Sequence, residues 1–385
     1  MNNENHAGPN FGKNKAIDTI ECTHSKILIV KSTTLNDPAW DDFLNNITGA
    51  EFEQSSLWAA ARKSEGWDFT RFVFFFDNKI AGGYQIFSKV KKYVGKIGYT
   101  IKGPVYSKEY SHLAPVIVEH LLKEVKKGEI NFLIIQPPLI APAIDVILDK
   151  KQIPKEKFLS IIKVSVEIDF NNKSATEIFA GLNRKRRQDL NKAENAGLRF
   201  TEGSYEDLDL FFQLMLITCE RKKVSPNPST LLYLKRIWEQ FALKKQIKLF
   251  FVEYNDEKIC GLISILFGKK VYMWKFGWSG KYASFHPGVF IFWKTIEWAI
   301  INKFDAADFM GTSKSYLPPH PKCCSKIPVT EIKGKGDIKL CFGGNLLIFP
   351  DARIVFNNLL LKIAYHMVIF TGKLSGNFKR MVNKL

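Results

Sequence analysis

Three short apolar runs in the second half of the chain, separated by polar turns, indicate an antiparallel β-meander. The runs are residues 249–254, 259–267 and 271–278. Apolar, β-branched and aromatic stretches bounded by Gly, Asn and Asp are typical of strands joined by tight turns. After a loop, residues 289–302 repeat apolar positions at helical spacing, which predicts a helix. A further strand is predicted over residues 306–310, and Gly311 ends it.

The same order of elements occurs earlier in the chain. Strands are predicted over residues 72–76, 80–87, 94–101 and 132–136, with a helix over 111–127 before the last of them. At one constant offset along the chain, several turn and strand residues of the two halves match. They are Asp77, Lys79, Ile80, Gly82, Gly98 and Tyr99, which align with Asp256, Lys258, Ile259, Gly261, Gly277 and Trp278. Two unrelated meanders would also match at a few turn positions, but the shared offset favours two copies of one α/β unit.

Domain boundaries follow from this pattern and from local composition. Residues 1–24 are predicted to be a flexible N-terminal tail, because positions 1–15 are mostly polar. Residues 25–168 form the predicted first domain and residues 169–350 the second, and 351–385 are predicted to be a C-terminal helix with a basic tail. The predicted fold class is α/β (α+β), with mixed, mostly antiparallel sheets.

Two predicted helix starts carry polar caps. Ser55 precedes an alanine-rich helix, and Ser174 with Glu177 has the spacing of a capping box. The segment from Asn183 to Gly197 follows the second cap and contains the strongest cluster of positive charge in the chain. It is predicted to be a helix with arginines on its surface.

Composition limits the class of protein. A chain of 385 residues is long enough for two domains with full cores. The net charge of +18 indicates a polyanionic partner: nucleic acid, anionic lipid or a phosphorylated substrate. The alternative is that the charge reflects a lysine-rich proteome and no specific partner. The six cysteines show no zinc-binding or disulfide spacing, and no signal peptide is evident. A cytoplasmic protein with reduced thiols and no metal is therefore expected.

The C-terminal helix has two interpretations. Residues 354–370 are apolar but include Lys362 and His366, and the stretch is too short to cross a bilayer. Four basic residues follow it, at Lys373, Lys379, Arg380 and Lys384. The helix either packs on its own domain or makes peripheral contact with an anionic membrane surface.

The sequence contains no motif of a covalent nucleophile, a Walker loop or a dinucleotide fingerprint. The reaction is therefore not expected to need a covalent enzyme intermediate. A meander followed by a loop and a helix is typical of acyl-CoA-type acyltransferases, in which backbone N–H groups at the helix start hold a phosphate. Residues 279–287 lack the glycine-rich phosphate signature of ordinary members of that fold.

Two such units in tandem resemble the FemABX family of cell-wall aminoacyltransferases, built from two N-acetyltransferase-like (GNAT) folds, and related exopolysaccharide-cluster acyltransferases. The residues that carry the resemblance are 54–58, 66–67, 79–83 and 103–105 in the first half, and 186–197, 308–311 and 338–344 in the second. The resemblance covers residues 50–350 and implies two tandem GNAT-like domains. It also implies transfer of an acyl or aminoacyl group to an amine of a peptidoglycan or exopolysaccharide precursor by direct attack.

The resemblance assigns expected roles to residues of the second half. Lys339 occupies the lysine of the family's Phe-Lys-x-x-Phe-Gly motif, with Ile338 in place of the Phe, and is expected near the developing oxyanion. The alternative is a surface lysine beside a structural turn. The basic helix start is expected to grip substrate phosphates, or else to be a solvated helix face. Its candidate residues are Arg184, Arg186, Arg187 and Lys192.

Further candidates complete the expected site. Asp308 is a candidate general base or else a turn former. His286 and Gly288, at the entry of the second-half helix, are candidates for contact with the donor phosphate. Candidates for the cleft of the first domain are Trp58, Tyr99 and Lys102.

The donor and acceptor stay open at this point. No permanently bound cofactor is expected, and the expected donor is aminoacyl-tRNA or acetyl-CoA. The positive charge of the chain favours tRNA. The absence of a long insertion after Arg221 fits either donor. Two other functions compete with envelope-precursor transfer. One is acetyl-CoA-dependent N-acetylation of a nucleotide sugar, and the other is non-catalytic binding of nucleic acid or a membrane surface.

Overall fold

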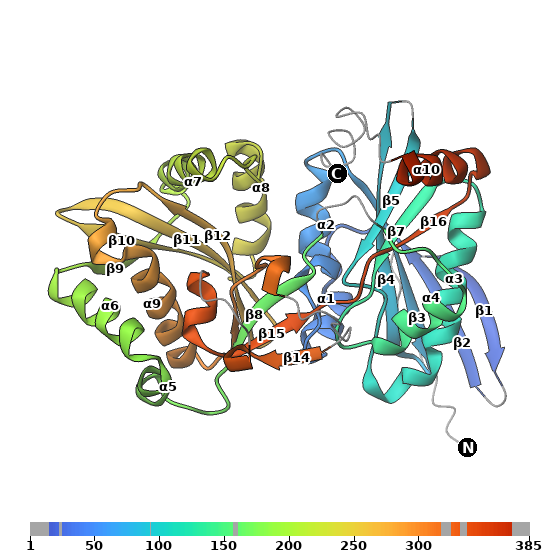
Figure 1. Ribbon diagram of the computed structural model, residues 1–385. Helices are drawn as coiled ribbons and strands as arrows, with labels where there is room; N and C mark the ends of the chain where they lie inside the picture. The colour runs from blue at the N-terminus through green and yellow to red at the C-terminus, as the bar shows by residue number, and fades with distance from the viewer. Residues whose placement is uncertain are drawn as a thin grey trace, which may run out of the picture. The chain divides into compact units, whose positions relative to one another are not determined.

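The computed structural model describes residues 15–22, 25–92, 94–156, 161–316, 325–331 and 337–371. The chain divides into two compact units (Figure 1). The first unit contains Met1–Ile161 and Pro350–Leu385, and the second contains Ile162–Phe349. Each unit is a mixed α/β fold whose described part includes a sheet of eight strands. The α/β class with two tandem units is thus confirmed.

The first unit has the strand order β1-β2-β3-β4-β5-β7-β16, with β6 paired to β4. Its strands are β1 (Lys15–Cys22), β2 (Ser25–Ser32), β3 (Asp68–Phe76), β4 (Lys79–Lys91), β5 (Gly95–Ile101), β6 (Val105–Tyr106), β7 (Phe132–Gln136) and β16 (Arg353–Phe356). Its helices are α1 (Pro38–Asn45), α2 (Ser56–Lys63), α3 (Ala114–Lys126), α4 (Pro142–Lys150) and α10 (Leu359–Thr371). The β5–β7 pair is parallel and its connection contains α3, whereas the other pairs of the path are antiparallel.

The second unit has the order β14-β15-β8-β13-β12-β11-β10-β9. Its strands are β8 (Val164–Asp169), β9 (Arg199–Gly203), β10 (Ile247–Tyr254), β11 (Glu257–Phe267), β12 (Lys270–Trp278), β13 (Ala306–Asp308), β14 (Ser325–Pro328) and β15 (Asn345–Ile348). Its helices are α5 (Ala175–Gly181), α6 (Arg184–Asn195), α7 (Leu208–Lys222), α8 (Leu231–Ala242) and α9 (Pro287–Ile301), and a 3₁₀ turn, η6, spans Ile338–Phe342. The β12–β13 pair is parallel and its connection contains α9. Both units therefore place one parallel pair with a helical crossover at the same point of a β-meander.

The two equivalent hairpins support the duplication but correct its register. Both turns have two residues with positive φ, Asp77 and Asn78 in the first unit and Asn255 and Asp256 in the second. Both hairpins also carry a β-bulge after the same number of residue pairs. The residue pairs of the two hairpins superimpose when Phe76 is matched to Tyr254. This match shifts the alignment of the two halves by one residue from the alignment that identical residues in the sequence had indicated. Two-residue turns with positive φ favour Asn and Asp at either position. The sequence alignment therefore paired the Asp residues of the two turns, although they occupy different turn positions.

Consecutive residues of the central strands show how helices cover both faces of each sheet. In the first unit a Cβ on Gly82 would meet Ile117 of α3, whereas a Cβ on Gly83 would meet Trp40 of α1. In the second unit a Cβ on Gly261 would meet Phe211 of α7. Because successive strand residues point to opposite faces, α1 and α3 lie on opposite faces of the first sheet. Figure 1 shows α7 and α8 on one face of the second sheet and α9 on the other.

The predicted domain boundaries need three corrections. The strand assigned to the end of the first domain is β8, which pairs with both β13 and β15, so the units divide at Ile161/Ile162. The expected N-terminal tail contains β1, whose backbone pairs with β2. The expected separate C-terminal segment belongs to the first unit, because β16 pairs with β7. The start of the C-terminal helix also moves, since Asn358 Oδ1 accepts from the backbone N–H groups of Leu360 and Leu361 and so caps α10.

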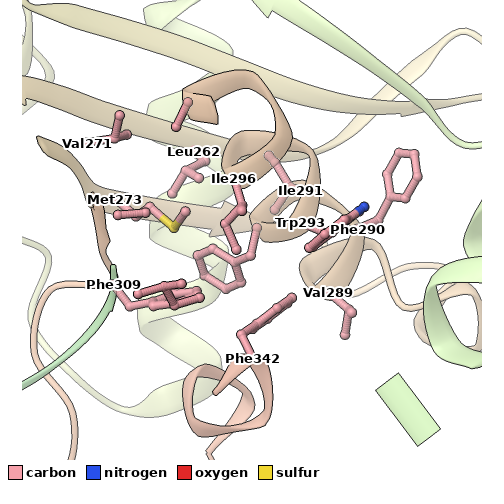
Figure 2. Close-up of a cluster of buried hydrophobic side chains, with 14 of the residues drawn as sticks. Leu262, Val271, Met273, Val289, Phe290, Ile291, Trp293, Ile296, Phe309 and Phe342 are labelled. Carbon is pink, nitrogen blue, oxygen red and sulfur yellow. The ribbon is translucent and has the colours of Figure 1, made fainter. Parts of the chain in front are cut away.

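A buried cluster of the second unit brings together side chains of its sheet and of α9. Figure 2 shows side chains of α9 beside Leu262 and Met273 of the sheet, with Phe309 and Phe342 next to each other below them. The Phe309 and Phe342 rings stack with centroids 5.4 Å apart. Phe342 belongs to η6, so this contact fixes the 3₁₀ turn to the end of β13. Among the described residues, no helix combines the length and the apolar character needed to cross a membrane.

Candidate active site

The sheet of the second unit opens where β12 and β13 diverge. These strands pair through three residues each, ending at Tyr272 and Asp308, but β12 continues to Trp278. The equivalent strands of the first unit, β5 and β7, pair through five residues each. There the Gly103 N–H also donates to the Gln136 carbonyl at 3.1 Å, which closes that strand end. Among the described residues, the ladder between β12 and β13 therefore ends at Asp308, and the residues after it are left to pair with other groups.

The turn after β13 is held by β8. Asp308 is 1 % exposed, and its Oδ1 accepts from the Ser165 hydroxyl and from the Met310 N–H, the latter at 2.7 Å. The Gly311 N–H donates to Ser165 Oγ at 3.2 Å. Burial raises the pKa of Asp308, against the opposing charge of Lys270. Asp308 is therefore enclosed with its Oδ1 held by two donors, and its expected role as general base stays a prediction.

Lys339 lies against the same turn. Its Nζ donates to the Met310 carbonyl at 2.7 Å and to the Gly311 carbonyl. Both carbonyls belong to residues with positive φ, 51° and 61°. An ammonium has three N–H donors, and the described residues supply acceptors for two of them. Lys339 is thus a half-buried cation bound to the open strand end, unlike the exposed lysine of the alternative interpretation.

Burial shapes the protonation of Lys339. It lowers the pKa of this lysine to about 8, although the carboxylates of Asp337 and Asp308 oppose the shift. The positive charge of Lys222 acts in the same direction as burial. Asp337 also caps η6, since its Oδ1 accepts from the Lys339 N–H at 3.0 Å. One aspartate therefore sets both the backbone and the electrostatic environment of the lysine.

A second lysine with a lowered pKa lies on the part of β12 that diverges from β13. Burial lowers the pKa of Lys275 to about 8, Cys219 opposes the shift, and the charge of Lys339 adds to it. The Lys275 ammonium lies 4.7 Å from the centroid of the Trp274 ring. Within the described part of the chain, no hydrogen bond or ion pair is formed by its Nζ. A desolvated amine with a pKa near 8 is suited to proton transfer at neutral pH.

Arg186 connects the basic helix to this region. Its guanidinium lies 5.4 Å from the Phe342 ring centroid, and its NH1 is 3.3 Å from Asp189 Oδ2. His286 Nε2 lies 3.4 Å from the other oxygen of Asp189. Arg186 is 8 % exposed, and its Nε has no hydrogen-bond partner among the described residues. Asp189 was not among the residues predicted from the sequence. Its two carboxylate oxygens lie next to Arg186 and His286, which are both predicted ligand contacts.

The start of α9 completes the cluster. A Cβ on Gly288 would lie 3.4 Å from the Phe276 ring and 3.9 Å from Ile338 of η6. These are ordinary van der Waals distances, so the first turn of α9 lies against both neighbours without requiring glycine at this position. The first turn of a helix has backbone N–H groups without intrahelical partners, and these attract anions. His286, the N-cap residue, forms no side-chain cap and is half-buried.

Three other predicted residues lie outside this cluster. Arg184 and Lys192 are exposed on α6. Arg187 donates to the Ala180 carbonyl at 2.9 Å and to the Leu182 carbonyl, so its guanidinium caps the end of α5. The structure therefore divides the basic helix into one arginine at the candidate site, one structural arginine and a solvent-facing set.

The predicted residues of the first unit are mainly packed in its interior. Trp58 meets Phe52 edge to face, with centroids 5.4 Å apart. The Tyr99 hydroxyl accepts from Arg62 Nε at 2.7 Å, and burial raises the pKa of Tyr99 to about 12. Lys102 is 2 % exposed and has a φ of 56° at the end of β5. None of the three is shown at a ligand site by these contacts, and their substrate-binding role stays a prediction.

Sequence reasoning missed several residues that build the site. They are Ser165, Asp189, Lys275 and Asp337. Asp337 carried a usable signal, since an Asp directly before a short helix is a frequent N-cap. Ser165 and Lys275 carried none, because their roles depend on contacts across the sheet. No group of three or more His, Cys, Asp or Glu residues suited to a metal is found in the described ranges.

Two protein families match separate parts of the chain. Residues 35–164 match the FemAB family, and residues 182–316 match the acetyltransferase (GNAT) domain family. The first match lies almost wholly in the first unit and the second in the second unit. No curated protein gives a significant match.

Solved structures with the same arrangement confirm the fold. A crystal structure of FemX superimposes with a TM-score of 0.71 at 16% identity, covering 86% of this chain and 99% of that one. A tandem GNAT protein from the clavulanic acid biosynthesis pathway gives a TM-score of 0.51 at 6% identity, covering 86% and 99%. A conserved protein of unknown function from Bacteroides thetaiotaomicron VPI-5482 gives 0.51 at 10% identity, covering 83% and 97%.

The family matches and the fold agree with each other. The chain is FemAB-like and is built from tandem GNAT-like units. This combination supports an acyl or aminoacyl transferase.

Proposed function

We propose that this protein transfers an acyl or aminoacyl group to an amine of a cell-envelope precursor of peptidoglycan or exopolysaccharide. The observation that carries the proposal is Lys339, whose ammonium binds the carbonyls at the open end of β13. It lies in the unit that matches the acetyltransferase family. A fixed cation at a strand end is suited to stabilise negative charge that develops on a carbonyl oxygen.

The proposed reaction is direct attack of the acceptor amine on the donor carbonyl. A C–N bond forms and the carbonyl oxygen becomes negative, where the third N–H of Lys339 stabilises it. Neutral Lys275 takes the proton that the amine loses. Collapse then breaks the C–O bond of an ester donor or the C–S bond of a thioester, and protonated Lys275 gives its proton to the leaving oxygen or sulfur, which restores the neutral amine. Asp308 positions the Met310–Gly311 turn and keeps the two carbonyls aligned on Lys339.

The donor is proposed to be aminoacyl-tRNA or acetyl-CoA, and both carry phosphates. His286 and the first turn of α9 would contact a phosphate at the edge of the cluster. Exposed Arg184 and Lys192 on α6 extend the positive surface, as expected for a polyanionic donor. Arg186 lies between these groups and η6. A cytoplasmic place of action follows, because both donors are cytoplasmic molecules.

A donor and acceptor assay tests the proposal. The full chain is incubated with glycyl-tRNA or with radiolabelled acetyl-CoA, together with lipid-linked precursor, nucleotide-linked precursor or amino sugar nucleotide. Transfer to a wall or polysaccharide precursor supports the proposal and identifies the donor. Acetylation of the sugar nucleotide alone would indicate the alternative N-acetyltransferase. If no donor is consumed while RNA binds with a steep salt dependence, the protein is a binding protein and the proposal is wrong.

A further inference from the structure

The C-terminal helix α10 of the first unit exposes a continuous apolar face. Four of its side chains are largely accessible, Leu359 at 68 %, Leu360 at 76 %, Ile363 at 45 % and Met367 at 57 %. At 3.6 residues per turn, these four positions fall within an arc of about 100°. Single exposed leucines are ordinary, but four on one helix face indicate an interaction surface.

The helix is held in place by its other side. Tyr365 is 7 % exposed and its ring lies 5.2 Å from that of Phe356 on β16. Tyr365 also belongs to a buried cluster with Ile134 and Ile354. Asn358 caps the start of α10. The exposed arc is therefore presented outward from a helix whose opposite side is packed on the sheet.

The helix and the sequence that follows it carry positive charge. Lys362 and His366 are exposed and lie beside the apolar arc on the helix. From Ala352 to the end of the chain there is no Asp or Glu, and there are six Lys and Arg residues. One of the six, Arg353, is paired in the interior with Asp145 and Asp149. The other five leave this end of the chain strongly basic.

We propose that α10 docks on the surface of an anionic lipid bilayer, lying in the plane of the interface. Leu359, Leu360, Ile363 and Met367 enter the boundary between head groups and acyl chains. An apolar arc beside Lys residues is the pattern of an interfacial helix, which combines insertion of apolar side chains with attraction to anionic lipid. A second copy of the chain fits less well, because a symmetric contact would bring the same positive charges together. The inference does not depend on the proposed transferase activity.

Vesicle binding tests the inference with the full chain. Flotation is measured with vesicles of phosphatidylcholine alone and of phosphatidylcholine mixed with phosphatidylglycerol. The double variant Leu360→Gln/Ile363→Gln removes two exposed apolar groups. Leu232→Gln is the matched control, because Leu232 is 65 % exposed on α8 of the second unit. All three proteins should keep the same melting temperature, since the substituted side chains are exposed.

The expected result is binding to the anionic vesicles only. The double variant should bind them at least about tenfold more weakly, because it loses two inserted side chains, and the control should bind like the unmodified protein. Added salt should weaken the binding of the unmodified protein. Equal binding by the double variant would overturn the inference, as would equal binding to neutral vesicles. A dimer that the double variant converts to a monomer, without vesicle binding, would instead assign the face to a second copy.

Discussion

Lys339 illustrates how one residue can serve both structure and chemistry. Its ammonium binds the carbonyls of Met310 and Gly311, so its removal leaves two acceptors without their donor. We expect Lys339→Met to lower turnover by tenfold or more, because losing one group that stabilises an oxyanion typically slows an enzyme by about 10²–10³. The free energy of unfolding should fall by only about 1–2 kcal/mol, because the substitution also removes a desolvated charge.

Steady-state kinetics and urea unfolding check this prediction. Lys244→Met is the control, since Lys244 is exposed after α8 and outside the candidate site. A large loss of stability with proportional loss of activity would make Lys339 a structural residue only. Retained turnover in a stable Lys339→Met variant would remove it from the mechanism.

Lys275 gives a prediction of pH dependence. Its pKa is lowered from 10.5 to about 8 in the folded protein. Between these values the unfolded chain binds more protons than the folded one, so this lysine makes stability rise with pH above 8. Below pH 8 the folded protein keeps a charge that burial disfavours. We therefore expect Lys275→Met to be more stable than the unmodified protein at pH 7, and the difference to shrink towards pH 10.

Thermal unfolding from pH 6 to 10 measures this difference, and rate profiles over the same range measure the chemical role. If neutral Lys275 accepts a proton while charged Lys339 stabilises the oxyanion, and both have a pKa of about 8, the rate of the unmodified protein should rise with pH to a maximum near 8 and fall above it. Lys275→Met should lack the rise and keep the fall. An unchanged rate profile would exclude that role, whereas an unchanged stability profile would show that the lysine is well solvated.

The difference between Lys339 and Lys275 also shows what the sequence can reveal about single residues. Lys339 was found because it lies in a motif-like context, and Asp308 because it precedes a strand-ending Gly311. Lys275 lies in an alternating aromatic strand and looks like an ordinary solvent-facing residue. Its lowered pKa arises from burial and from the charge of Lys339, which is distant from it in the chain, while Cys219 opposes the shift.

At the scale of elements, the packing of α7 on β12 depends on a missing side chain. A Cβ on Gly277 would lie 2.6 Å from the Met215 backbone nitrogen and 2.8 Å from the Leu214 carbonyl carbon. These are backbone atoms of a helix and cannot rotate away. We expect Gly277→Ala to push α7 off the strand and to lower the free energy of unfolding by about 1–3 kcal/mol.

Gly181→Ala is the matched control for that measurement. Nothing lies within 4 Å of a Cβ built on Gly181, the last residue of α5. Alanine there should leave stability unchanged or raise it by up to about 1 kcal/mol, because glycine loses more backbone entropy on folding. Equal stability of Gly277→Ala and Gly181→Ala in urea unfolding would contradict the close packing of α7 on β12.

Most elements could be predicted from the sequence, and the exceptions have a common cause. The meanders and caps depend on local patterns, and Ser55, Ser174 and Glu177 cap as expected. The alignment of identical residues between the two halves was wrong by one position at the hairpins, because Asn and Asp suit both turn positions. The strand β16 was predicted as helix because its apolar residues continue almost without a break into α10. What separates them is pairing with β7, which is distant in the chain.

At the scale of the whole molecule, the boundary between units follows strand pairing and not chain order. The chain leaves the first unit at Ile161 and returns to it at Pro350. In each sheet an antiparallel strand lies beyond the parallel pair, β16 in the first unit and β8 in the second. The strand β16 comes from the C-terminal end of the chain, whereas β8 comes from the segment before the second meander. No local signal in the sequence distinguishes these sources, which is why the boundary was misplaced.

This arrangement predicts different results for two C-terminal truncations. Ending the chain after Asn357 removes α10 but keeps β16, which pairs with β7 through four residues on each strand. Ending it after Phe349 also removes Arg353, leaving Asp145 and Asp149 without their shared partner. It further uncovers Ile134, which is 3 % exposed. We expect the shorter chain to lose several kcal/mol from the first unit, and the longer one much less.

Limited proteolysis and thermal unfolding of the two truncated proteins separate these expectations. Cleavage sites of the shorter chain should concentrate within residues 25–156, because the sheet of the first unit loses an edge strand, while the second unit stays protected. The longer chain should resist cleavage in both units, since its β7 is still covered and Arg353 still bridges the carboxylates of α4. If both truncated proteins resist protease equally, β16 contributes little, and the first unit is stable without the segment that returns to it.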